Sequence, residues 1–198
     1  YFKNVQFPHD QESLNQFMRQ ITPDTGPIDF DVNTDAIAAL FDKLEGAIMM
    51  AHSQGVMHTW KTMTKTKNIK AVIALEGGGF FSFPTDEPHP ITEASEEIEY
   101  IMVSPDTFKV FTQTPILLIY GDNIPTEHSN IPELDIWRIR LDLAYQWANI
   151  VNKHGGNVTI IHLPKIGIYG NTHFPMSDLN NIDIANVILE WLHEQKLD

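Results

Sequence analysis

Ser53 lies in a pentapeptide whose spacing is typical of an activated serine. The segment Ala51-His52-Ser53-Gln54-Gly55 follows the apolar run 47–51 and precedes residues 54–66, which have helical character. A serine at a strand-to-helix turn forms a nucleophile elbow when the residues two positions before and after it are small enough for the tight turn. The alanine and the glycine meet that demand. By itself the pattern is a weak signal, because a serine that only caps a helix can occur in the same sequence pattern.

The same turn predicts groups that stabilise negative charge. Ser53 would stand at the N-terminus of the following helix, where the helix dipole favours a developing anion. The backbone N–H of Gln54 is the expected oxyanion donor, because it belongs to the residue after the nucleophile. His52 is expected to direct its side chain away from the base that activates Ser53. These features together predict attack on a carbonyl carbon.

The expected base is His173, in the segment Gly170-Asn171-Thr172-His173-Phe174. In an elbow-type hydrolase the histidine comes last along the chain, after the final strand. Of the nine histidines, only His173 lies between the last predicted strand and the last predicted helix. The ordinary alternative is a loop histidine that caps this helix.

Two carboxylates compete as the acid that orients the base. Glu76 directly follows the predicted strand 69–75, at the ligand-binding edge of a parallel sheet. Asp122 follows Gly121 after the next strand and is also a typical turn residue. We favour Glu76, whose longer side chain can reach His173 from one strand further in, and keep Asp122 as the runner-up. An exposed loop charge is the ordinary alternative for Glu76.

The elements that must position these residues alternate along the chain. Continuous apolar runs, as in strands buried on both faces, predict strands at 47–51, 69–75, 115–120 and 158–163. Helical spacing predicts helices at 10–20, 34–44 (capped by Thr34), 54–66, 135–153 and 180–195, with a weak helical patch at 95–103. The alternation predicts an α/β fold with a mostly parallel sheet flanked by helices.

The bulk composition narrows the function classes. The 198 residues suffice for one domain, and the net charge of −13 disfavours nucleic acid and anionic membranes as partners. No apolar run reaches the roughly 18 residues of a membrane helix, and no signal peptide is visible. The chain has no cysteine and no histidine spacing typical of a zinc site, so neither a metal nor an organic cofactor is implied.

Several segments resemble the α/β-hydrolase superfamily, and more narrowly the bacterial esterase seven-one-three group. The resemblance spans nearly the whole chain and is most specific in Gly167-Ile168-Tyr169-Gly170-Asn171-Thr172-His173, followed by Asn180-Asn181. It implies an ester-cleaving enzyme in which Glu76 is the triad acid. A complete fold of this class has about eight strands. The four predicted strands look like the last four, so we expect the early strands, and a second oxyanion donor, to come from an N-terminal segment or a complementary chain.

The sequence therefore predicts a single, partial α/β-hydrolase domain over 1–198 that cleaves a small-molecule carboxylic ester through Ser53, His173 and Glu76. A non-catalytic binding module on this scaffold, and a lactonase or acyltransferase with the same triad, are the alternatives. Residues 1–33 and 77–92 are expected to be lid or pocket loops, with Phe80, Phe81 and Phe83 as pocket-lining candidates. Trp137 and Tyr145 are expected on the packing face of their helix. No pattern indicates the oligomeric state or the compartment.

Overall fold

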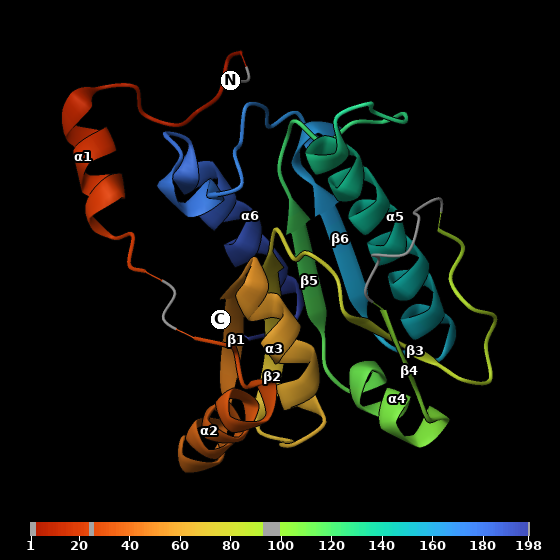
Figure 1. The fold of residues 1–198 in the computed structure, drawn as a ribbon. Helices are drawn as coiled ribbons and strands as arrows, with labels where there is room; N and C mark the ends of the chain where they lie inside the picture. Colours follow the sequence, from red (N-terminus) through yellow and green to blue (C-terminus); the bar gives the residue numbers. More distant parts are fainter. Residues whose placement is uncertain (1–2, 24–25, 93–99, 198) are drawn as a thin grey trace.

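The computed structural model describes residues 3–23, 26–92 and 100–197. Four parallel strands form the main sheet in the order β1-β2-β5-β6, and two further strands, β3 and β4, pair in parallel beside it (Figure 1). The strands are β1 (Ala47–His52), β2 (Ile69–Leu75), β3 (Phe81–Pro84), β4 (Tyr100–Val103), β5 (Ile116–Tyr120) and β6 (Val158–His162). The helices are α1 (Gln11–Arg19), α2 (Phe30–Lys43), α3 (Gln54–Met63), α4 (Pro105–Thr112), α5 (Pro132–Lys153) and α6 (Asn181–Glu194), with short 3-10 turns at Leu163–Ile166 and Pro175–Ser177.

The main strands are apolar throughout because both faces of the sheet are covered. Successive side chains of a strand point to opposite faces. In β2, Val72 and Ala74 join the core with α3 and α5, whereas Ala71, Ile73 and Leu75 join the core with α6. Helices accordingly lie on both faces of the sheet (Figure 1). The predicted parallel α/β architecture is confirmed.

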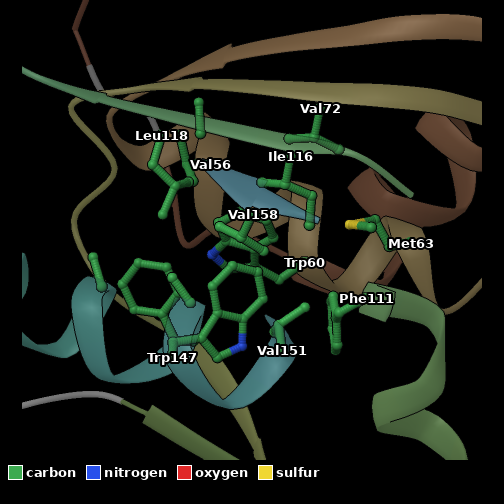
Figure 2. Packing of buried hydrophobic residues seen from close by; sticks show 14 of the residues in the cluster. Val56, Trp60, Met63, Val72, Phe111, Ile116, Leu118, Trp147, Val151 and Val158 are labelled. Atoms are coloured by element: carbon green, nitrogen blue, oxygen red, sulfur yellow. The ribbon is translucent and has the colours of Figure 1, made fainter. Parts of the chain in front are cut away.

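The larger core is built on aromatic side chains. Trp60 of α3 and Trp147 of α5 meet with ring centroids 4.9 Å apart, and Phe81 packs 5.1 Å from Trp147. Figure 2 shows the two indoles among aliphatic side chains from β2, β5 and β6. Phe81 and Phe83 are buried in this cluster, so they support the fold rather than line a substrate pocket; Phe80 is only partly buried against it.

The structure corrects the sequence prediction between the second and third predicted strands. Residues 81–84 form β3, not loop, and residues 100–103 form β4, not helix; the rest of the patch predicted at 95–103 lies outside the described residues. Each strand has only four residues. This length is too short to distinguish the two-residue alternation of a strand from the 3.6-residue repeat of a helix. Helix α4 was not predicted, although Ser104 caps it and Pro105 occupies its first turn.

The start of α2 was also predicted wrongly. Asp29, not Thr34, caps the helix, because its Oδ1 accepts hydrogen bonds from the N–H groups of Asp31 and Val32, both at 3.0 Å. Thr34 is buried one turn inside, where its hydroxyl donates to the Phe30 carbonyl at 2.6 Å. Helix α2 packs against α3 and so backs the helix that follows Ser53.

Candidate active site

Ser53 is the single residue between β1 and α3, and its backbone is strained. Its φ of 52° and ψ of −122° lie in a region that residues with a Cβ seldom adopt. The turn is anchored on the neighbouring strand, because the Ser53 N–H donates to the Leu75 carbonyl at 3.0 Å. Gly55 has room to spare, since a Cβ there would lie 3.9 Å from the Cβ of Ala51. The strain thus rests on Ser53 itself.

The structure brings Ser53, His173 and Glu76 together. Nε2 of His173 lies 2.8 Å from the Ser53 Oγ, and Nδ1 lies 3.4 Å from Oε2 of Glu76. Because the carboxylate can only accept, Nδ1 carries the ring proton when the imidazole is neutral, and Nε2 is then free to accept from the serine hydroxyl. The three side chains therefore form a continuous chain of hydrogen bonds from Ser53, just after β1, to Glu76, just after β2.

Glu76 is only 4% exposed, so its carboxylate is isolated from bulk water. Its backbone N–H donates to the Ile119 carbonyl at 2.9 Å, and its Oε1 accepts a short hydrogen bond from the Gly121 N–H. The following residue, Gly77, packs so closely on α3 that an added Cβ would meet Val56 at 2.8 Å. The Gly121 N–H thus holds the carboxylate, while β5 and α3 fix the main chain at Glu76 and Gly77.

Asp122 has different partners. Its Oδ2 accepts from the Gly170 N–H at 2.9 Å and its Oδ1 accepts from the Asn123 N–H at 2.7 Å. Its own N–H faces the Asn171 carbonyl at 3.3 Å. These bonds fasten the loop after β5 to the loop that carries His173.

Asp178 belongs to the segment that resembles the α/β-hydrolases, but the sequence alone assigned it no role. It is fully buried, and its carboxylate accepts from the Thr172 N–H at 2.8 Å, the Thr172 hydroxyl at 2.9 Å and the Asn171 side chain at 3.1 Å. Asn171 also exchanges hydrogen bonds with Asn180, at 2.8 and 3.1 Å. The cluster ties the two residues before His173 to the start of α6. The only signal in the sequence was the density of Asn and Asp around the histidine.

Two aromatic neighbours of His173 lie where they were not expected. His52 does not point away from the base: its ring centroid is 4.7 Å from that of His173. Trp137 of α5, predicted on the packing face of its helix, instead lies 4.9 Å from the His173 ring. The guanidinium carbon of Arg140, also on α5, lies 5.0 Å from the centroid of the Trp137 ring. Only tertiary structure brings these side chains to the site.

Gln54 is the first residue of α3. The N–H groups of a helix's first turn have no intrahelical partner, and the Gln54 N–H is one of these groups. Its side chain is exposed.

Two cavities in the described structure are lined by neither Ser53 nor His173. One of about 820 Å³ lies between α5 and the end of β6 and includes His162, Tyr145 and Tyr169 in its wall. The other, of about 430 Å³, runs along α3 and is lined by Met57 and Phe80 among mostly apolar residues. Within the described ranges, no group of three His, Cys, Asp or Glu side chains could hold a metal ion, and no helix is long and apolar enough to cross a membrane.

Comparison with known proteins agrees with this architecture. The solved structure of a novel bacterial esterase superposes with a TM-score of 0.75 at 26% identity, covering 98% of this chain and 52% of that one. The chain has the fold of an α/β-hydrolase. It is also 26% identical over 191 residues to the probable secreted lipase phiG of Fungal sp. (strain ATCC 74256), covering 85% of this chain and 52% of that protein. No protein-family profile matches. This hydrolase-like chain thus spans about half the length of both relatives.

Proposed function

We propose that this protein is a serine esterase of the α/β-hydrolase class, with Ser53 as nucleophile, His173 as base and Glu76 as the orienting acid. The observation that carries the proposal is the 2.8 Å contact between Nε2 of His173 and Oγ of a serine held in a strained elbow. The similarity to a lipase and to an esterase supports the same reaction class. Kinship with the seven-one-three group is part of this proposal.

The proposed reaction has two halves. Ser53 Oγ attacks the ester carbonyl carbon while Nε2 of His173 takes the hydroxyl proton. The tetrahedral adduct collapses, the bond to the alkoxy oxygen breaks, and His173 gives its proton to the departing alcohol. A water molecule then attacks the acyl-serine with the same proton transfers, which releases the carboxylic acid and restores Ser53.

Glu76 stabilises the imidazolium that forms on His173 during both halves. A carboxylate shielded from water interacts more strongly with a neighbouring cation than an exposed one does. The 3.4 Å distance from Oε2 to Nδ1 supports this role and is expected to shorten when the ring is charged. Asp122, with both oxygens engaged by backbone N–H groups, is better suited to hold the loops together.

We propose that the Gln54 N–H is one of two oxyanion donors and that the second comes from sequence outside this chain. The strand order supports this view, since β1 lies at one edge of the main sheet in the described structure. A further strand could pair with β1, from the same polypeptide or another one. The loop after that strand would then lie close to Ser53 and could supply the second oxyanion donor. Losing one oxyanion donor costs roughly 10²–10³ in rate, so the chain alone is expected to be a poor catalyst.

The test is covalent labelling of the longest natural form of the protein with a fluorophosphonate probe, followed by mass spectrometric mapping of the modified peptide. We expect modification of Ser53, and loss of labelling in Ser53→Ala and His173→Ala. A folded, full-length protein that is not labelled would contradict the proposal and favour a non-catalytic binding module. If Ser53 is labelled, product analysis with competing water and alcohol distinguishes a hydrolase from an acyltransferase.

A further inference from the structure

His52 contacts the candidate base through both its ring and its polar edge. Its Nε2 lies 2.6 Å from the backbone carbonyl oxygen of His173, across 121 residues of sequence. Its ring packs at 4.7 Å from the His173 ring and at 5.2 Å from that of Phe174, between centroids. His52 is the last residue of β1 and directly precedes Ser53. The end of this strand therefore positions both the serine and a side chain that bonds to the loop carrying His173.

The hydrogen bond fixes the tautomer of His52. A carbonyl oxygen can only accept a hydrogen bond, so Nε2 of His52 must carry the proton. In the neutral ring Nδ1 is therefore unprotonated. Burial lowers the pKa of His52, with the positive charge of His173 acting in the same direction, while the His173 carbonyl and the Glu76 carboxylate oppose them. A neutral His52 does not compete with the imidazolium of His173 for the negative charge of Glu76.

We propose that His52 is a positioning residue that holds the backbone of His173, and so keeps Nε2 of that histidine in line with Ser53. Glu76 and Trp137 contact the imidazole ring of His173, and Asp178 fixes Thr172, the residue before it. His52 bonds to the backbone of the residue itself. The inference rests on the proposed esterase function, because it assigns His52 a part in the same proton transfer.

The experiment compares His52→Leu with His52→Gln in the longest natural form of the protein. Leucine keeps apolar bulk but removes the donor, whereas the glutamine amide offers an N–H at about the position of Nε2. Both are assayed for kcat and KM with p-nitrophenyl butyrate, for the rate of fluorophosphonate labelling, and for melting temperature.

We expect His52→Leu to lower kcat and the labelling rate by roughly 10- to 100-fold with KM within about 2-fold, since small misplacements of a reacting group have effects of this size. His52→Gln should recover most of the loss. Two results would overturn the inference: both variants remaining within about 2-fold of wild type, or glutamine being as impaired as leucine while equally stable.

If His52→Leu does not fold, His52→Gln and His52→Asn decide the question. The shorter amide of asparagine cannot reach the His173 carbonyl, so only glutamine should retain the kcat and labelling rate. Equal activity of the two amides would contradict the inference. A wild-type protein that neither hydrolyses the ester nor reacts with the probe would instead refute the proposed function, so the two failures are distinguishable.

Discussion

The N–H of Gly121 donates to Oε1 of Glu76, so the end of β5 holds the carboxylate that follows β2. The contact leaves no room for a side chain: a Cβ on Gly121 would lie 2.9 Å from that oxygen and 3.3 Å from the carbonyl oxygens of Asn171 and Thr172. Gly121 is thus both a donor to the proposed triad acid and a spacer against the histidine loop.

Gly121→Ala should therefore displace the Glu76 carboxylate from Nδ1 of His173. We expect kcat on a short-chain ester to fall by roughly 100-fold, the scale of an ångström-sized misplacement. Gly55→Ala is the matched control, because its added Cβ meets only the Ala51 Cβ, at an ordinary 3.9 Å. Equal activity of the two variants would show that Glu76 does not depend on the space at Gly121.

Glu76→Gln and Asp122→Asn separate the two candidate acids. Removing the negative charge beside His173 should lower kcat by roughly 10²- to 10⁴-fold, as replacement of a triad acid does elsewhere. Asp122→Asn keeps one acceptor for the Gly170 or Asn123 N–H, so we expect kcat within about 10-fold and a loss of stability near 1 kcal/mol. Steady-state kinetics and urea unfolding measure both effects. The reverse order of kcat values would make Asp122 the acid.

Asp178→Asn should destabilise the fold, because the new amide presents donors to a site with three donors already. An unsatisfied buried donor costs about 1–3 kcal/mol, and we expect a loss of free energy of unfolding in that range. The control is Asp183→Asn, an exposed position in the first turn of α6. Urea unfolding of both variants is the measurement; a loss no greater for Asp178→Asn than for the control would be inconsistent with a structural role.

His162 should make stability depend on pH. Burial, reinforced by the positive charge of Lys165, lowers its pKa below the ordinary value of about 6.5. As pH falls through 6.5 the unfolded chain takes up a proton that the native state does not, so the free energy of unfolding falls with it. His162→Gln should lose less stability than wild type between pH 8 and pH 5.5 in urea titrations. His52, with a pKa lowered in the same direction, leaves some dependence in the variant. Equal losses would contradict the assignment.

Local patterns were sufficient for the four main strands and for the turn at Ser53. A parallel strand covered on both faces requires an unbroken apolar run, and a tight elbow requires small neighbours, so each leaves a mark within a few residues. His52, Trp137 and Asp178 left none of comparable clarity. Their contacts with the histidine loop depend on how β1, α5 and α6 are arranged in space, which no short window of sequence encodes. The four-residue strands β3 and β4 were not predicted for a related reason, since each is stabilised as a strand by pairing with the other.

Ser53 and His173 are 120 residues apart in sequence, and they meet only because the parallel strands of one sheet end at the same edge. Contacts of such long range form late in folding, because the entropy of closing the loop must first be offset by pairing of the strands. A reactive serine therefore cannot precede the assembled sheet. During refolding, reactivity toward a serine-directed probe should lag behind the recovery of helical signal, and the interval between the two would measure how slowly the parallel strands find their register.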